Sequence, residues 1–146
     1  VAARLAQENQ TKSLDYLSTL RDRLEDGILA NVPGTQRNGD ALHRIGNTCN
    51  ISFDGVEAES LLIALDLEGI AVSTGSACSS GSLEPSHVLQ AMGFSSHRTQ
   101  NSIRFSLGLG NTEQEVDHVL TLLPGVVSRL RSVTHRGSRT TSALPR

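Results

Sequence analysis

The sequence predicts an α+β (α/β) fold in which a small sheet of three to four strands is covered by long N- and C-terminal helices. Two observations support this prediction: apolar residues recur at the 3.6-residue helical period near both ends, and short alternating segments lie between them. With 146 residues, the chain can bury roughly two thirds of its unfolded surface in one core. We therefore expect a single folded unit.

Apolar periodicity predicts the two long helices, whose charged residues fill the opposite side. The first should end before the turn at Pro33-Gly34, because proline lacks an amide donor. The last opens with the capping-box pair Thr112 and Glu115, and Pro124 predicts a kink or a restart within it. The apolar faces consist of Leu14, Leu17, Leu20, Leu24 and Ile28 in the first helix and Val116, Val119, Leu120, Leu123, Val127 and Leu130 in the last.

Three segments between these helices have the pattern of strands. Residues 48–53 and 102–107 alternate between apolar and polar side chains, and residues 70–72 form a short apolar run. In residues 102–107 the alternation places Arg104 on the face opposite Ile103, so Arg104 should point out of the sheet. These segments predict the strands of the sheet.

Two shorter helices are predicted between the strands. One should end at Gly69, and the other should begin at Pro85, because proline suits the first helical position. Residues 35–40 follow the first helix and have the composition of a loop. The residues expected to face inward are Leu61, Leu62 and Leu65 in the first of these helices and Val88, Leu89 and Met92 in the second.

Composition and charge argue against several classes of function. The net charge is −2, and 37% of the residues are hydrophobic but only 3% aromatic, so no strong surface charge favours a nucleic acid partner. No apolar run approaches the roughly 20 residues that cross a bilayer, which argues against a membrane protein. The two cysteines lie in dissimilar surroundings, which favours reduced thiols over a disulfide. We expect a cytoplasmic protein.

The clearest candidate for chemistry is the thiol of Cys78. Small residues cannot bury it in an apolar pocket, and they leave the backbone free to move. The helix predicted to begin at Pro85 would favour the thiolate through its dipole. We therefore predict a mobile nucleophile, with an ordinary flexible loop as the alternative; Cys49, on an alternating strand, is expected to be a packing residue. The loop reads Ser73-Thr74-Gly75-Ser76-Ala77-Cys78-Ser79-Ser80-Gly81-Ser82.

Several motifs resemble, in the same order, those of the NifS/IscS group of cysteine desulfurases, which are class V aminotransferases of pyridoxal-phosphate fold type I. The resemblance extends from residues 20–25 to residues 129–131, and residues 69–89 resemble the active-site loop of the family. The other motifs are Asn50-Ile51-Ser52-Phe53, Glu59-Ser60-Leu61-Leu62 and Ser102-Ile103-Arg104-Phe105-Ser106-Leu107-Gly108.

This resemblance implies an enzyme that takes sulfur from L-cysteine and leaves L-alanine. Pyridoxal phosphate would act as the electron sink, and Cys78 would receive the sulfur as a persulfide. Arg104 matches the arginine that holds the substrate carboxylate, although it could also be an ordinary surface residue of a strand. The form of the loop implies sulfur supply to an iron-sulfur scaffold or another acceptor protein, where Cys78 could touch iron transiently. Full-length relatives form homodimers.

The chain departs from the family in having no match to the cofactor-binding domain. Its only lysine is Lys12, in a predicted helix without an adjacent histidine. We therefore expect residues 1–133 to be the C-terminal small domain of a desulfurase and residues 134–146 to be a basic, disordered tail. The chain alone is expected neither to bind pyridoxal phosphate firmly nor to turn over cysteine.

Two other functions remain open at this stage. One is a stand-alone sulfur-carrier or interaction module that receives persulfide from another protein; the other is a purely structural domain. The histidines show no metal-ligand spacing with either cysteine, so no intrinsic metal site is predicted. His87 could assist a Cys/His nucleophile, but its position favours a surface residue.

Overall fold

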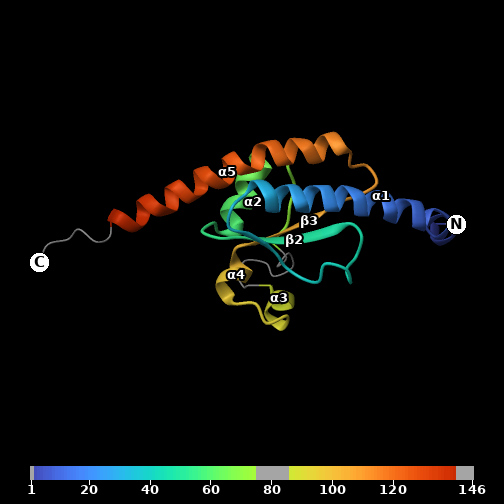
Figure 1. Ribbon diagram of the computed structural model, residues 1–146, viewed down its shortest axis with the longest axis horizontal. Coiled ribbons are helices and arrows are strands. Elements are labelled where there is room, and N and C mark those ends of the chain that lie inside the picture. The colour runs from blue at the N-terminus through green and yellow to red at the C-terminus, as the bar shows by residue number, and fades with distance from the viewer. Residues whose placement is uncertain (1, 75–85, 141–146) are drawn as a thin grey trace, which may run out of the picture.

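Two long helices and a three-stranded sheet form the body of the protein (Figure 1). The computed structural model describes the backbone of residues 2–74 and 86–140, with the side chains of Arg4, 13–74 and 86–134. The helices are α1 (Ala2–Asn31), α2 (Ala58–Leu67), α3 (His87–Ala91), α4 (Ser96–Gln100) and α5 (Glu113–Thr140). The strands are β1 (Thr35–Arg37), β2 (Thr48–Phe53) and β3 (Ser102–Ser106).

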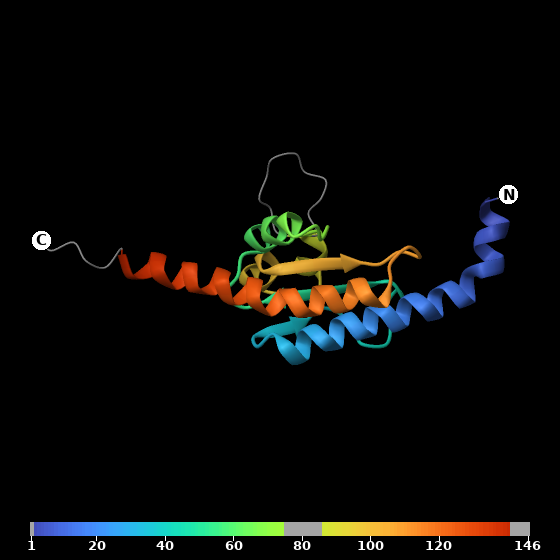
Figure 2. The same ribbon diagram turned by 90° about the horizontal axis from the view of Figure 1, so that it is seen from above.

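The sheet is antiparallel and has the order β1-β2-β3. Helices α1 and α5 run parallel to each other along one face of the sheet, while α3 and α4 lie on the other side (Figures 1 and 2). Helix α2 packs against α5. This arrangement confirms the predicted α+β fold with a small sheet covered by the first and last helices.

The core lies between the sheet and the two long helices and is largely aliphatic. Strands β2 and β3 contribute alternate residues to it, and the two long helices contribute most of their predicted apolar faces, although Leu14 at the start of the α1 face is exposed. The fully buried side chains include Leu20, Ile28, Ile51, Phe53, Leu61, Leu65, Ile103, Leu123 and Val127.

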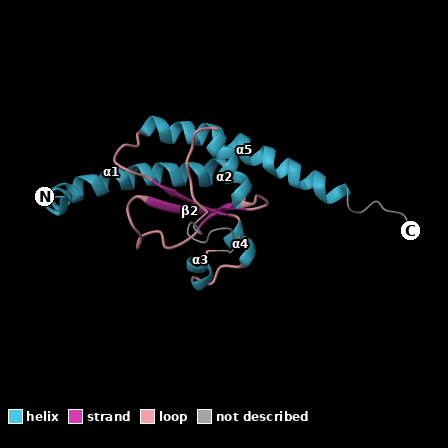
Figure 3. Ribbon diagram, turned by 180° about the vertical axis from the view of Figure 1, so that it is seen from behind, coloured by secondary structure: helices cyan, strands magenta, loops and turns pink. Residues whose placement is uncertain are grey.

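Several local features differ from the sequence prediction (Figure 3). Residues 35–37, predicted as loop, form β1, because pairing with β2 supplies the hydrogen bonds that this polar segment lacks by itself. Residues 70–72 do not form a regular strand; this segment joins the sheet only through an isolated bridge at Ser73. Helix α4 was not predicted, because five residues are too few to show a helical period.

Two helices also differ from the prediction. In α3, Leu89 is buried, but Val88 and Met92 are about half exposed, because only one side of this short helix meets the protein. Of the kink or restart predicted at Pro124, the restart does not occur: α5 continues through the proline, and buried residues on both sides of it hold the helix in place. It also continues to Thr140, beyond the expected start of the tail, because extending a formed helix costs little. Residues 141–146 lie outside the described part of the chain.

An ion-pair cluster lies on the side of α1 where the sequence places solvated charges. Glu25 is fully buried, and its carboxylate accepts hydrogen bonds from Arg37 Nη1 at 2.9 Å and from Arg44 Nη1 at 2.6 Å. The two arginines come from β1 and the loop after it, and they neutralise the carboxylate where water cannot. The cluster therefore attaches the β1–β2 connection to α1.

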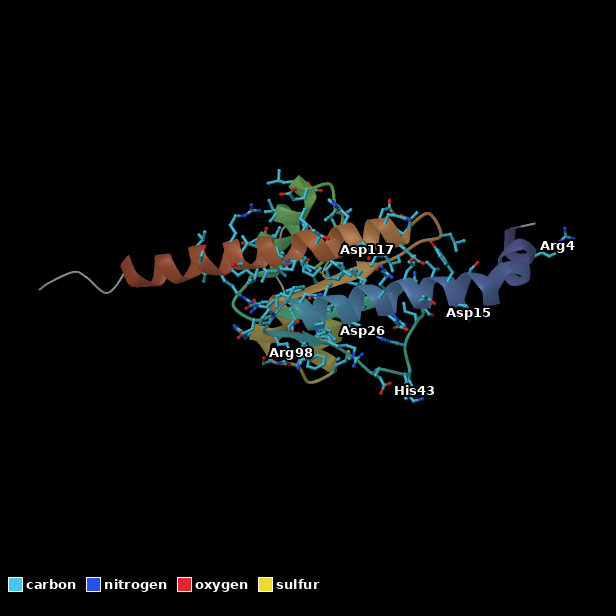
Figure 4. All side chains as sticks on the ribbon, turned by 45° about the horizontal axis from the view of Figure 1, so that its top comes forward. Arg4, Asp15, Asp26, His43, Arg98 and Asp117 are labelled. Carbon is cyan, nitrogen blue, oxygen red and sulfur yellow. The ribbon has the colours of Figure 1, made fainter. Side chains whose placement is uncertain are left out.

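Replacing Glu25 should strongly destabilise the fold. In Glu25→Ala, two guanidinium groups lose their counter-charge, and we expect the free energy of unfolding to fall by about 3 kcal/mol. This expected loss is at the low end of those for breaking a buried ion pair, because Arg37 keeps 32% of its side chain exposed. Urea denaturation of the variant measures the loss. Asp26→Ala, which alters the exposed next residue (Figure 4), is the control, and equal losses in both variants would contradict the prediction.

The predicted capping box at the start of α5 is present. Glu115 Oε2 accepts a hydrogen bond from the Thr112 backbone N–H at 2.8 Å, and Thr112 Oγ1 accepts one from the Glu115 N–H at 3.3 Å. The Thr112 backbone bond, with a smaller contribution from Asn111, holds the pKa of Glu115 below its ordinary value of 4.5.

This capping box should make stability sensitive to acid. A carboxylate with a lowered folded-state pKa stabilises the protein fully above its unfolded pKa, and that contribution is lost as the pH falls through the folded value. In Glu115→Gln, the melting temperature should therefore decrease less than in the wild type as the pH falls below 4.5. Thermal melts across this range provide the measurement. Glu59→Gln removes an acidic side chain from the first turn of α2, which has no side-chain cap hydrogen bond, and is the control; an equal change in both variants would contradict the prediction.

Candidate functional site

The candidate site lies on the face of the sheet turned away from α1 and α5. Ile103 and Phe105 of β3 are buried in the core, while Arg104 between them is exposed on the opposite face. This outcome confirms the orientation predicted from the alternation. Directly across from Arg104, on β2, lies Asn50.

The backbone of Arg104 holds the chain segment that leads toward Cys78. The Ser73 N–H donates to the Arg104 carbonyl at 3.1 Å, and the Arg104 N–H donates to the Ser73 carbonyl at 2.6 Å. This pair of bonds is the isolated bridge at the outer edge of β3. Cys78 itself lies outside the described residues, so the structure gives no distance between its thiol and Arg104.

The segment that follows residues 75–85 is also attached to the protein. Ser86 is buried and caps α3, where its Oγ accepts a hydrogen bond from the Leu89 N–H at 3.5 Å. His87 is exposed beside it. The chain on either side of the segment that contains Cys78 is therefore held by hydrogen bonds.

The guanidinium group of Arg104 is available to an external anion. Among the described side chains, those of Arg4, 13–74 and 86–134, Arg104 has no hydrogen-bond or ion-pair partner, in contrast to Arg37 and Arg44, which are paired with Glu25. A planar guanidinium with free donors matches the two oxygens of a carboxylate. The geometry thus suits recognition of a small carboxylate ligand.

A network of polar side chains connects the site to α4. Arg98 Nε donates to Asn38 Oδ1 at 2.7 Å, and Asn38 Nδ2 donates to Asn50 Oδ1 at 2.7 Å and to Ser102 Oγ at 2.8 Å. The Arg98 guanidinium also lies 4.3 Å from the centre of the Phe94 ring (Arg98 is labelled in Figure 4). The sequence gives no sign of this network, because its members come from separate elements.

Cys49 is a poor candidate for the reactive thiol. Its side chain is buried, and burial, with a smaller effect of nearby Glu25, raises the pKa of the thiol to about 12. The thiolate is the nucleophilic form, so this cysteine is unreactive at neutral pH. This result confirms the prediction that Cys49 is a packing residue.

The described residues do not form a site for pyridoxal phosphate. The chain has one lysine, Lys12, which belongs to α1 and not to the strands and connections around Arg104. A cavity of about 680 Å³ lies between residues 69–72, β3 and α5, but Arg104 does not line it. The residues present therefore do not fit this cofactor.

Among the described residues, which do not include Cys78, no group of three or more His, Cys, Asp or Glu side chains could hold a metal ion. None of the helices there is both long and apolar enough to span a bilayer.

Comparison with known proteins places these features in a family. Residues 2–119 match the aminotransferase class-V model. Cysteine desulfurase 2 of Trichormus variabilis is 49% identical over 91% of this chain, and a cysteine desulfurase of Gluconacetobacter diazotrophicus is 42% identical over 92%. The chain spans about a third of the length of these curated relatives, 33% and 34% respectively.

Structural comparison points to the same family. A solved structure named NifS-like protein superposes with a TM-score of 0.74 at 30% sequence identity, over 86% of this chain and 31% of the other. The matched region contains both the sheet with Arg104 and the segment that bears Cys78. The chain therefore belongs to the aminotransferase class-V family.

Proposed function

We propose that residues 1–133 are the C-terminal small domain of a cysteine desulfurase, in which Cys78 receives sulfur from L-cysteine. The observation that carries the proposal is the backbone bridge between Ser73 and Arg104, which joins the segment leading to the thiol to an exposed arginine. Relatives named cysteine desulfurase, at 42% and 49% identity, support this function.

Arg104 and Cys78 have distinct roles in the proposed reaction. Arg104 binds the carboxylate of L-cysteine through paired N–H donors and orients the substrate. The Cys78 thiolate attacks the substrate Sγ, forming an S–S bond while the Cβ–Sγ bond breaks. The electron pair of the broken bond stays on carbon, which takes up a proton and leaves as L-alanine, and Cys78 keeps the transferred sulfur as a persulfide.

The cofactor belongs to another part of the proposed enzyme. Pyridoxal phosphate would supply the electron withdrawal that makes the carbon–sulfur bond breakable. Since the residues described here do not fit that cofactor, the chain alone should not turn over cysteine. A complete cytoplasmic enzyme, as a homodimer, would then pass the persulfide sulfur to an iron-sulfur scaffold or another acceptor protein.

Cys78 should be the only cysteine of this chain that carries sulfur. After the full-length, cofactor-loaded enzyme is incubated with L-cysteine, alkylation and mass spectrometry should find a persulfide on the peptide containing Cys78. Cys78→Ser should reduce sulfide release to background. Cys49→Ala should keep wild-type release, because a thiol with a pKa of about 12 does not take part.

Two outcomes would contradict this assignment. Persulfide on Cys49, or wild-type sulfide release by Cys78→Ser, would show that another thiol accepts the sulfur. A persulfide that forms on the 146-residue chain only when a separate desulfurase is added would instead support a stand-alone sulfur carrier.

Arg104 should act mainly on substrate binding. In Arg104→Lys the charge is kept but the planar pair of donors is lost, and we expect KM for L-cysteine to rise about tenfold, equivalent to about 1.4 kcal/mol. Steady-state kinetics of the full-length enzyme provide the measurement. Arg129→Lys, an exposed arginine on α5, is the matched control. An unchanged KM in Arg104→Lys would show that Arg104 is an ordinary surface residue.

A further inference from the structure

We propose that Asn50 is a second substrate-binding residue, whose side-chain amide donates a hydrogen bond to the carboxylate held by Arg104. This inference rests on the proposed function and extends it to a residue on a different strand. It is carried by three features of the sheet: the pairing of Asn50 with Arg104, the orientation of the Asn50 amide, and the network that holds this orientation.

The first feature is the type of strand pair. Arg104 directs both its backbone N–H and its carbonyl toward Ser73, and the Asn50 carbonyl accepts from the Asn38 N–H at 2.8 Å. The backbone groups of Asn50 and Arg104 therefore make their hydrogen bonds to other residues and not to each other, so the two form a non-hydrogen-bonded antiparallel pair. In such pairs the Cα atoms lie only about 4.5 Å apart and the side chains are closest. One small ligand can reach both side chains.

The second feature is the orientation of the Asn50 amide. Its Oδ1 accepts from Asn38 Nδ2 at 2.7 Å, and the same Nδ2 donates to Ser102 Oγ of β3 at 2.8 Å. The amide NH₂ diverges from that contact and makes no hydrogen bond within the part of the chain described. Asn50 therefore keeps its amide donors available on the face of the sheet that also carries Arg104.

The third feature is the rigidity of the support. Asn38 is 9% exposed, and its own carbonyl oxygen is fixed by Arg98 Nε at 2.7 Å. Because Arg98 can only donate, Asn38 must present its oxygen to Arg98 and its NH₂ to Asn50. The charge on Arg98 thus determines which end of the Asn50 amide remains free.

The ligand class follows from the chemistry of these groups. Arg104 and the free end of Asn50 present only donors, and neither has an acidic partner among the side chains that the structure describes. A planar carboxylate with two acceptor oxygens can engage both at once. Hydrogen bonds to a charged acceptor are stronger than those between neutral groups, so the second donor should contribute measurably to binding.

Two substitutions at Asn50 separate a ligand contact from a structural role. Asn50→Asp keeps the oxygen that Asn38 needs but replaces the donors with a negative charge, whereas Asn50→Ala removes both. If Asn50 only supports the network, Asn50→Asp should weaken ligand binding less than Asn50→Ala does. If Asn50 binds the carboxylate, Asn50→Asp should weaken ligand binding more than Asn50→Ala does, because the new carboxylate repels the ligand and competes for Arg104.

The experiment uses the full-length, cofactor-loaded protein. Calorimetric titration with L-alanine gives Kd, and kinetics with L-cysteine give KM and kcat. We expect Asn50→Ala to raise Kd and KM about tenfold with a much smaller change in kcat, and Asn50→Asp to raise them further. Thr48→Val, on the same face of β2, should stay within about twofold of the wild type.

The outcomes distinguish this inference from the proposed function. Wild-type Kd and KM in the Asn50 variants, or a milder effect of Asp than of Ala, would overturn the inference while the desulfurase assignment stands. A wild-type protein that binds L-alanine but releases no sulfur from L-cysteine would refute the desulfurase assignment, and the Kd series would still test Asn50. A wild-type protein that neither binds L-alanine nor releases sulfur from L-cysteine would overturn both.

Discussion

The register between β2 and β3 determines both faces of this sheet. Ile51 faces Ile103, and Cys49 faces Phe105, on the core side. The next pair along the strands, Asn50 and Arg104, takes the opposite face because side chains alternate. A slip of one residue would move the apolar set into water and Arg104 into the core. The energetic cost of that exchange is what keeps Arg104 in place.

Burial of charge plays a different role in the same fold. The core is almost entirely aliphatic, yet Glu25 lies within it at 0% exposure, supported by Arg37 and Arg44. The connection between β1 and β2 has few apolar side chains that could attach it to α1. A compensated carboxylate provides that attachment and gives the connection one preferred position. Asn38 follows β1 directly, so the same ion pairs also fix its position.

The sequence was informative wherever a periodic pattern was long enough. The long helices, β2 and β3 were predicted, as were the capping box and the outward orientation of Arg104, because each depends on neighbours in the chain. Features set by distant partners were not predicted. Strand β1 depends on pairing with β2, and the burial of Glu25 depends on Arg44. Asn50 was identified only as part of a motif, since its partner Arg104 is defined by strand register.

The structure describes two of the predicted functional residues, Arg104 and Cys49, but not Cys78. Arg104 has the predicted orientation, and Cys49 has the predicted burial. The role of Cys78 stays a proposal because it lies outside the described residues. It is supported by the attached chain on either side and by relatives named for desulfurase activity.

The bridge at Ser73 also limits how far Cys78 can lie from the outer edge of β3. Cys78 follows Ser73 by five residues, and a fully extended chain spans at most about 3.4 Å per residue, so the Cα atom of Cys78 stays within roughly 17 Å of that of Ser73. Under the proposed function, an acceptor would have to bring its receiving atom close to this radius around the outer edge of β3. The sulfur would therefore be transferred beside the sheet.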